Sequence, residues 1–457
     1  MNCKTVPLLK RKKKMKKVLI LGAGMVAKPI ADYLLKNNFK VTMASRTKSK
    51  AETIIAGHKN GIARAWKSDD LEILNNMVSE HDITVSLLPY EYHMRVASFC
   101  IRHKKNMVST SYVSKEMNQL DEEAKNAGIL LLNEMGVDPG VDHMTAMRVI
   151  DKVHEQGGKI KEFYSLCGAL PAPEEVDNPL GYKFSWSPQG VLKASNNAAT
   201  YRENGEIVEI QADDIFKNPL QIDFPEVGKL EVYPNRNSLI YLQLYNLQEA
   251  ETVYRGTFRY PYWCESIDAM KQLKLLSHEI QNFEEKSYKQ IIAEAIGVYP
   301  KNVKEKLAEK MKVRLDHPAI ISLDWLGYFD NDLIKIKEGS TFDLTAELMM
   351  RKMMLPENGR DMVVMLHSLL IEKKNGENEV VKSRMVDFAT EEDTAISRTA
   401  ALPAAIAVKL ILENKIDEKG VQIPVNKSIY EPVLKELEQH GISMTEEWNL
   451  QKSEKLN

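Results

Sequence analysis

Two glycines near the start of the chain have the spacing of a phosphate-binding turn. In the segment KKVLILGAGMVA, an apolar run leads directly into Gly22, Gly24 and Ala27. Gly22 permits a tight turn, Gly24 lets the backbone approach a pyrophosphate, and the small Ala27 allows close packing of strand and helix. Free N–H groups at the helix start attract phosphate charge. We therefore expect this turn, including Met25 and Val26, to bind a dinucleotide cofactor.

The residues after the second apolar run favour one kind of dinucleotide. A carboxylate at this position binds the ribose 2′-hydroxyl of NAD, but the chain has Ser45, Arg46 and Thr47 there. A guanidinium suits a 2′-phosphate instead. The sequence therefore predicts NADP(H) over NAD, although Arg46 could be a solvated loop residue. Leu88 closes the fourth apolar run, where the backbone is expected to pass under the cofactor.

Alternating apolar runs and helical patterns define the elements that would hold these residues. Strands are predicted at 18–21, 39–45, 62–66, 83–88, 107–109 and 129–133. Helical patterns separate most of them, as at 92–104 and 114–127. This rhythm is typical of an α/β fold, here an N-terminal Rossmann-like, doubly wound parallel sheet over residues 16–140. The basic leader at 1–15 is expected to be disordered.

The pattern changes beyond residue 140. A helix (141–156) and a strand (161–170) precede a loop-rich region (171–201), two strand-like runs (239–244 and 253–260) and a helical block (265–326). The pair Asn375-Gly376 predicts a hairpin, and 399–414 reads as an apolar helix. We expect a mixed α/β substrate and dimerisation domain (141–264 and 327–396), a small helical subdomain (265–326), and a C-terminal helix (397–457) that returns to the first domain and ends in a tail.

Composition is that of an ordinary globular protein. Of 457 residues, 44% are hydrophobic and 28% are charged, with a formal net charge of -2. That balance favours neither nucleic acid nor a membrane as a partner, and no apolar run reaches the roughly 18 residues of a membrane-spanning helix. The four cysteines are scattered, which predicts a reduced, cytoplasmic setting and no metal site.

Several longer segments carry a more specific signal. They are NEMGVDPGVDH at 133–143, LPAP at 170–173, NPLGYKFSWS at 178–187, YPNR at 233–236, YRGTFRY at 254–260 and TAALPAA at 399–405. Together they resemble the glutamate-forming saccharopine dehydrogenases (saccharopine reductases) of lysine metabolism. The resemblance covers residues 15 to 414 and implies an NADP(H)-dependent homodimeric enzyme. Its implied reaction is the reversible reduction of the imine of L-glutamate and 2-aminoadipate 6-semialdehyde to saccharopine.

Saccharopine carries three carboxylates, so its site needs fixed cations. Arg236 and Arg259 lie in segments that resemble the substrate loops of the family, and we expect both to bind carboxylates. Thr257 and Phe258 belong to the same predicted substrate segment. The alternative for either arginine is a surface ion pair, worth ~0–1 kcal/mol.

The ends of the fifth and sixth predicted strands supply the candidates for proton transfer. Ser111 and Tyr112 follow the fifth strand, and the resemblance implies that both contact substrate. Asp138 follows the sixth strand and can face the substrate amine, so Asp138 and Tyr112 are the predicted catalytic residues. Helix capping by Ser111, core packing by Tyr112 and an ordinary Asp-Pro-Gly turn at Asp138 are the alternatives.

Further residues are expected near the cofactor. Met135, Gly136, Val137 and Asp138 form an irregular segment whose main chain could approach the nicotinamide. Trp186 and Ser187 are expected near the cofactor or the substrate. The isolated histidines His93 and His143 are more typical of structural residues.

Two rival functions stay open from the sequence. A related dehydrogenase such as carboxynorspermidine dehydrogenase would act on a cationic polyamine and should require pocket carboxylates, not two arginines. A non-catalytic dinucleotide sensor is the other alternative.

Overall fold

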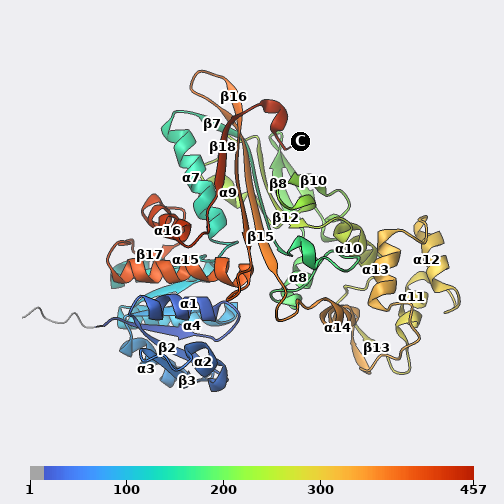
Figure 1. The fold of residues 1–457 in the computed structure, drawn as a ribbon, viewed down its shortest axis with the longest axis horizontal. Helices are drawn as coiled ribbons and strands as arrows, with labels where there is room; N and C mark the ends of the chain where they lie inside the picture. Colours follow the sequence, from blue (N-terminus) through green and yellow to red (C-terminus); the bar gives the residue numbers. More distant parts are fainter. Residues whose placement is uncertain (1–14, 457) are drawn as a thin grey trace, which may run out of the picture. The chain divides into compact units, whose positions relative to one another are not determined.

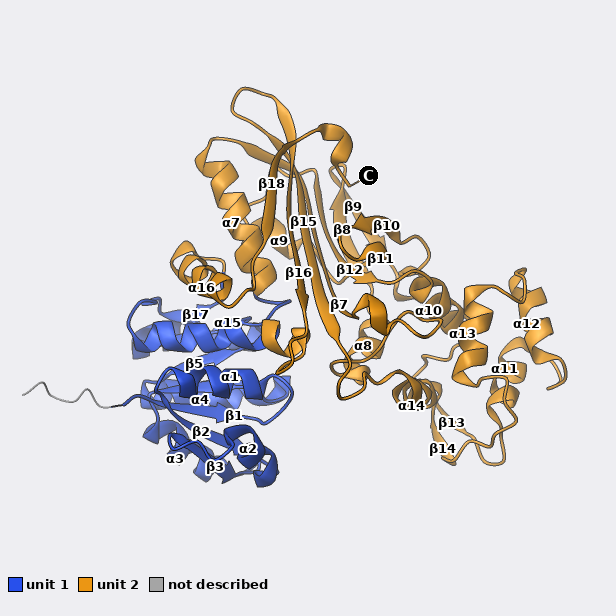
Figure 2. Ribbon diagram, viewed as in Figure 1, with its two compact units in different colours: residues 1–140, 400–424 blue, residues 141–399, 425–457 orange. Residues whose placement is uncertain are grey.

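The computed structural model describes residues 15–456 as two compact units (Figure 2). Within the described residues, unit 1 comprises 15–140 and 400–424, and unit 2 comprises 141–399 and 425–456. The chain passes from one unit to the other after Gly140, Thr399 and Pro424. Apart from Met15, the predicted basic leader lies outside the described residues.

Unit 1 is built on a parallel sheet flanked by helices (Figure 1). Its strands within residues 15–456 are β1 (Lys17–Leu21), β2 (Lys40–Ser45), β3 (Gly61–Ala65), β4 (Ile83–Ser86), β5 (Asn106–Ser109), β6 (Leu130–Leu132) and β17 (Gly420–Gln422). They lie in the order β17-β6-β5-β4-β1-β2-β3, and every pairing is parallel. The doubly wound sheet predicted from the sequence is confirmed.

Helices connect these strands and cover the sheet. They are α1 (Ala27–Lys36), α2 (Lys48–Ile55), α3 (Leu71–Glu80), α4 (His93–His103), α5 (Lys115–Gln119) and α6 (Asp121–Ala127), with a 3-10 turn η1 (Tyr90–Tyr92). One core cluster joins strand residues such as Leu19 and Leu131 to Leu74 of α3 and Val96 of α4. This packing fixes the carboxyl ends of the strands, where ligands of open α/β sheets bind.

The outer strand β17 was missed by the sequence analysis, which placed only a helix and a tail after residue 397. Gly420 pairs with Leu130 of β6, and the Val421 N–H donates to Asp121 Oδ1 at 2.8 Å. A three-residue strand has no readable period, and its neighbour lies about 290 residues earlier in the chain, so local pattern could not find it.

The apolar helix α15 (Ala395–Leu412) passes from unit 2 into unit 1. By length and hydropathy it is the one helix among residues 15–456 that could span a membrane, but 72% of it is buried inside the protein. Ala401, Ala404, Ala405 and Val408 are fully buried. This degree of burial is typical of a helix in the core of a globular protein, and we assign α15 to the core.

Unit 2 is built on a mixed sheet. Its strands within residues 15–456 are β7 (Lys159–Pro171), β8 (Ala199–Glu203), β9 (Glu206–Ile210), β10 (Leu220–Phe224), β11 (Gly228–Pro234), β12 (Thr252–Arg259), β15 (Asp361–Glu372), β16 (Asn378–Phe388) and β18 (Thr445–Leu450). The main order is β10-β11-β12-β7-β15-β16-β18, with β8 beside β12 and β9 beside β8. The predicted hairpin joins β15 to β16, with Gly376 at φ +85° in its turn.

Helices complete unit 2. They are α7 (Val141–Glu155), α8 (Pro188–Ala194), α9 (Ile240–Leu244), α10 (Trp263–Gln272), α11 (Tyr288–Ile296), α12 (Val303–Met311), α13 (Pro318–Leu326), α14 (Thr341–Met353) and α16 (Lys427–Gln439), with a small sheet of β13 (Ile280–Asn282) and β14 (Glu338–Ser340). The helical block extends past the predicted limit of 326 to Met353. One core cluster joins it to the sheet, for example Trp263 and Leu323 with Tyr164 and Phe258, so it does not form a compact unit of its own.

Two parts of unit 2 differ from the sequence expectation. Residues 239–244, predicted as a strand, form helix α9, because Tyr241 and Tyr245 lie four residues apart and both are buried. The Tyr245 N–H donates to the Tyr241 carbonyl at 3.0 Å. Short apolar runs are compatible with either element, and tertiary packing decides between them. The region beyond 414, predicted as a tail, forms β17, α16 and β18.

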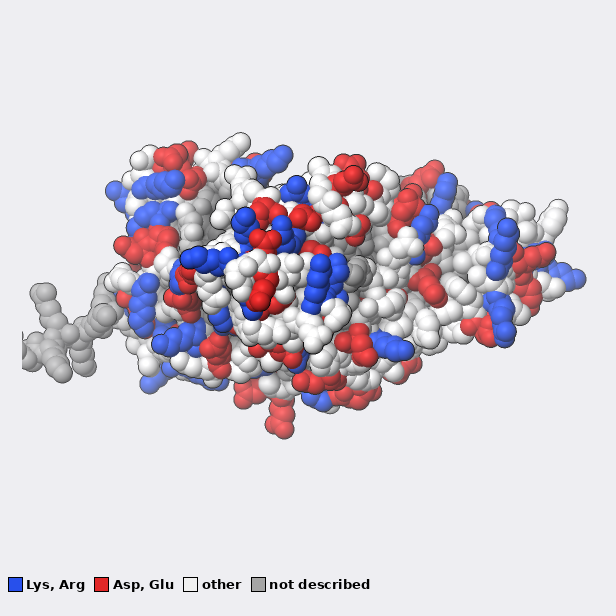
Figure 3. All heavy atoms as spheres, turned by 90° about the horizontal axis from the view of Figure 1, so that it is seen from above, with Lys and Arg blue, Asp and Glu red and all other residues white. Residues whose placement is uncertain are grey.

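Acidic and basic side chains are interspersed on the face of the molecule seen in Figure 3. This mixing agrees with the nearly balanced formal charge of -2.

Candidate active site

The glycine turn after β1 has the shape that a bound pyrophosphate requires. Gly22 has φ +110°, and a Cβ there would lie 2.9 Å from the Leu87 carbonyl oxygen, so a side chain is excluded. Around Gly24 there is open space, since a Cβ would meet nothing within 4 Å. The next residue, Met25, is 57% exposed. The turn therefore leaves an accessible place against the backbone, just before α1 begins at Ala27.

At the end of β2 the structure places Ser45, Arg46 and Thr47 at the same sheet edge as this turn. The Thr47 N–H donates to Ser45 Oγ at 3.4 Å, and Arg46 is exposed. These donors fit a phosphate on the ribose. Leu88 is half-buried and packs against the core of unit 1.

A buried histidine links the ends of β4 and β5. His93 Nδ1 lies 2.9 Å from Ser86 Oγ, and its Nε2 lies 2.9 Å from Ser111 Oγ. Burial lowers the pKa of His93 to about 4, so the ring is neutral at pH 7 and accepts one hydrogen bond while donating another. His93 therefore holds the hydroxyl of Ser111, a predicted substrate residue.

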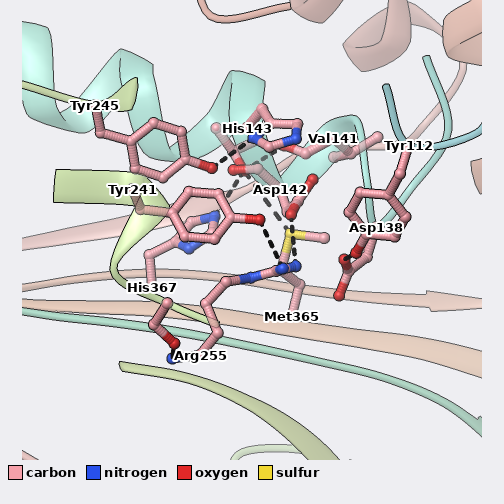
Figure 4. Close-up of polar contacts among 12 residues, drawn as sticks. Tyr112, Asp138, Val141, Asp142, His143, Tyr241, Tyr245, Arg255, Met365 and His367 are labelled. Carbon is pink, nitrogen blue, oxygen red and sulfur yellow. Dashed lines mark hydrogen bonds and ion pairs between the residues drawn. The ribbon is translucent and has the colours of Figure 1, made fainter. Parts of the chain in front are cut away.

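The two predicted catalytic residues contact each other. The Tyr112 hydroxyl donates to Asp138 Oδ1 at 3.0 Å, and Asp138 is half-buried (Figure 4). Glu134, which the sequence analysis did not single out, ties their two segments together. Its N–H donates to the Ser111 carbonyl at 3.1 Å, and its Oε1 accepts the Val113 N–H at 2.8 Å. A hydroxyl and a carboxylate joined in this way can pass a proton.

The segment after β6 is a tight loop that only glycine can form at two positions. The Gly136 N–H donates to the Pro139 carbonyl at 2.9 Å. Gly140 has φ +145°, and a Cβ there would lie 2.1 Å from the Gly136 carbonyl oxygen. The side chains of Met135 and Val137 are buried. Asp138 is the one residue of 135–140 that is not buried, so its side chain is what a ligand could reach.

In unit 2, Arg259 is a buried cation without an ionic partner. It is 4% exposed, and its Nη1 donates to the Phe258 carbonyl at 2.7 Å and its Nη2 to the Tyr233 hydroxyl at 3.4 Å. Its carbon Cζ lies 4.9 Å from the ring centre of Tyr182 and 5.3 Å from that of Trp263. Its Nε is buried with no hydrogen-bond partner, and no carboxylate within residues 15–456 forms an ion pair with it.

The neighbours of Arg259 in the predicted substrate segment have different surroundings. Phe258 is fully buried, 5.6 Å from Phe224 between ring centres, so its side chain fills the core. Thr257 is half-buried. Arg236 is exposed at φ +59° in the turn after β11, where its carbonyl accepts the Thr200 N–H at 2.9 Å.

The structure assigns local contacts to Trp186 and Ser187. Ser187 Oγ accepts the Gly190 N–H at 3.2 Å and so caps α8. The Trp186 Nε1–H donates to the Tyr182 hydroxyl at 3.1 Å. Tyr182 is also the ring under Arg259, so Trp186 supports the aromatic surroundings of that cation. Their contact with a cofactor stays a prediction.

A second buried arginine on β12 was missed by the sequence analysis. Arg255 Nη2 lies 3.0 Å from Asp142 Oδ2, and its Nη1 donates to the Tyr241 hydroxyl at 2.7 Å (Figure 4). Beside this pair, His143 Nδ1 lies 2.6 Å from the Tyr245 hydroxyl, which agrees with a structural role for this histidine. The sequence carried little signal for this pair, because α7 and β12 each contain other charged residues and the two partners are 113 residues apart in the chain.

Comparison with known proteins gives the same family for both units. Residues 18–132 match the family model of the saccharopine dehydrogenase NADP binding domain, and residues 136–442 match that of the saccharopine dehydrogenase C-terminal domain.

Individual relatives match over nearly their whole length. The chain is 36% identical over 444 residues to an NADP(+), L-glutamate-forming saccharopine dehydrogenase of Pyricularia oryzae, covering 94% of this chain and 98% of that protein. A protein of the same name from Schizosaccharomyces pombe is 36% identical over 448 residues, covering 95% and 99%. The solved apo saccharopine dehydrogenase (L-Glu forming) of Saccharomyces cerevisiae superposes with a TM-score of 0.88 at 34% identity, covering 95% of this chain and 99% of that chain. The chain belongs to the saccharopine dehydrogenase family.

Proposed function

We propose that this protein is an NADP(H)-dependent, L-glutamate-forming saccharopine dehydrogenase, an oxidoreductase that acts on CH–NH groups. With NADP+ and one water, it oxidises saccharopine to the imine and hydrolyses that imine to L-glutamate and 2-aminoadipate 6-semialdehyde, with release of NADPH and a proton, and the reaction is reversible. Support comes from relatives that carry this name, which align with 94–95% of this chain and with 98–99% of their own length.

One observation of the structure carries the substrate assignment. The Arg259 guanidinium is buried among aromatic rings and neutral oxygens. A buried charge is costly unless an opposite charge compensates it. A carboxylate of saccharopine would supply that charge and bind the free N–H groups in a bidentate manner. The cationic polyamine of the rival dehydrogenase would meet repulsion here. Arg236 is proposed to bind a second carboxylate.

The residues around the glycine turn fit NADP(H). Gly22, Gly24 and the start of α1 would hold the pyrophosphate, and Arg46 with Ser45 and Thr47 would hold the 2′-phosphate. The bound nicotinamide supplies or accepts the hydride. Met135, Gly136 and Val137 would present their main chain, and Leu88 its half-buried side chain, to this cofactor.

Tyr112 and Asp138 would move the proton that accompanies hydride transfer. When saccharopine is oxidised, the amine loses a proton, and Asp138 can accept it directly or through the Tyr112 hydroxyl. In the reverse direction the same pair returns the proton to the amine nitrogen. Ser111, fixed by His93, would orient the substrate through its hydroxyl.

A homodimer and a cytoplasmic location remain proposals. The family resemblance supports the first. The second is supported by the three cysteines of the described residues, Cys100, Cys167 and Cys264, which are buried and form no disulfide.

A spectrophotometric assay tests the function. Purified protein mixed with saccharopine and NADP should produce the reduced cofactor, measured by its absorbance, and NAD should support much slower turnover. Absence of cofactor reduction with both dinucleotides would refute the proposed activity.

A further inference from the structure

A cavity in unit 2 is lined by tyrosines and carboxylates, in contrast to the cationic surroundings of Arg259. It has a volume of about 120 Å³ and lies where β7, β8 and β12 meet the loop that follows β9. The residues that give it its chemistry are Tyr164, Tyr201, Tyr254, Glu203, Asp214 and Asn218. Three aromatic rings and two carboxylates therefore face one space, and no arginine or lysine lines it.

The three tyrosines are held close together by strand pairing. Tyr254 and Tyr164 are direct partners on the parallel strands β12 and β7, with ring centres 5.7 Å apart. Tyr201 of β8 meets Tyr254 edge-on, at 4.9 Å and 73°. Tyr164 and Tyr254 are each 5% exposed. None of the three hydroxyls forms a hydrogen bond with another residue between 15 and 456. None of these hydroxyl oxygens is among the buried, unpartnered atoms of residues 15–456, so the hydroxyls reach accessible space, where a ligand or water can bind them.

The charge of the cavity is negative. Glu203 is half-buried and has no ion-pair partner in the described part of the chain. Asp214 stands exposed at the rim and pairs with Lys217. Burial and the nearby Glu203 charge both raise the pKa of Tyr201, which agrees with a negative potential among the rings.

We propose that this cavity binds a small organic ammonium ion. The electron-rich faces of tyrosine rings attract alkylammonium groups, and Glu203 supplies the opposite charge. A carboxylate ligand would be repelled by Glu203, and a neutral apolar ligand would leave that carboxylate and the hydroxyls without partners. The cavity therefore differs in ligand class from the carboxylate-binding surroundings of Arg259, and the proposal does not rest on the proposed activity.

Choline and its neutral isostere 3,3-dimethyl-1-butanol test this proposal as probes of equal shape. In calorimetric titrations of the full chain, choline should bind roughly tenfold or more tightly than the alcohol, since ring and carboxylate recognise charge. Glu203→Gln, which keeps the shape, should remove most of this preference. Tyr201→Phe should retain it, because the ring persists, whereas Tyr201→Ala should weaken choline binding about tenfold.

Glu206→Gln is the matched control, because Glu206 is exposed on the neighbouring strand β9 and does not line the cavity. It should bind both probes as the unaltered protein does. Equal affinity for choline and the alcohol, or no choline binding at millimolar concentration, would overturn the proposal. So would an equal loss of choline binding in Glu206→Gln and Glu203→Gln. The saccharopine assay is a separate measurement, so failure of one proposal is distinguishable from failure of the other.

Discussion

The same substitution should have different effects at two arginines on one strand, lowering substrate binding at one and fold stability at the other. Arg255 and Arg259 lie four residues apart on β12, and each is 4% exposed. Arg255 has a carboxylate partner, Asp142 at 3.0 Å, whereas Arg259 has only neutral partners in the described chain. Methionine would remove the charge in both cases while filling much of the volume. The structure therefore predicts loss of binding at one position and loss of stability at the other.

The expected losses of saccharopine binding and of stability can be estimated from the contacts of Arg259 and Arg255. At Arg259, substitution removes up to two charged hydrogen bonds to the substrate, each worth ~1.5–3 kcal/mol. A loss of about 3 kcal/mol corresponds to a roughly 100-fold rise in the KM for saccharopine. The free energy of unfolding should change by less than about 1 kcal/mol, because relief from burying an unpaired charge offsets the lost contacts. Arg255→Met should instead destabilise the fold by about 3–5 kcal/mol, since it breaks a buried ion pair by removing one partner.

Urea unfolding and thermal shifts with saccharopine would measure both effects. Saccharopine binding should raise the Tm of the unaltered protein and fail to raise that of Arg259→Met. If Arg259→Met kept its KM within about threefold, or lost as much stability as Arg255→Met, the assignment of Arg259 as the anion-binding residue would be wrong.

Three further outcomes are expected. Arg46→Ala should raise the KM for NADP about tenfold and leave that for NAD nearly unchanged, in parallel initial-rate assays. Tyr112→Phe and Asp138→Asn should each lower kcat roughly 100-fold. The double variant should lose little more, because the two groups form one hydrogen-bonded pair; additive losses would contradict this. The contribution of His93 to the unfolding free energy should fall by about 3 kcal/mol between pH 6.5 and pH 4, because burial lowers its pKa to about 4 and the unfolded chain is protonated first. In His93→Gln this part of the pH dependence should be absent.

The parallel sheet of unit 1 was predictable because its strands are short apolar runs separated by helical patterns. The same alternation placed Gly22 and Gly24 after the first strand, and Tyr112 and Asp138 after the fifth and sixth, because parallel strands bring their carboxyl ends to one edge. The hydrogen bond between Tyr112 and Asp138 was not predicted and comes from the structure. The helix α9 was mistaken for a strand because six residues fit either period. Tyr241 and Tyr245 become a helical face only when their tertiary partners are known.

Buried polar contacts were beyond the sequence for a different reason. Glu134, His93 and the Asp142–Arg255 pair owe their roles to partners that are distant in the chain or on another element. A charged residue in an apolar segment indicates that some partner exists, but it does not identify that partner. The cavity of Tyr164, Tyr201 and Tyr254 likewise depends on strand register, which single strands do not encode.

Because β17 lies near the C-terminal end of the chain, the sheet of unit 1 cannot be completed until late in protein synthesis. On the ribosome, residues 1–140 emerge first, but the sheet they form is finished only by residues 420–422. Until then the backbone edge of β6, with its three buried leucines, has no neighbour on that side. Exposed apolar edges recruit strands from other chains. The nascent dinucleotide-binding unit therefore has an open flank throughout the synthesis of unit 2, and a fragment ending near Gly140 should aggregate unless 400–424 are supplied in trans.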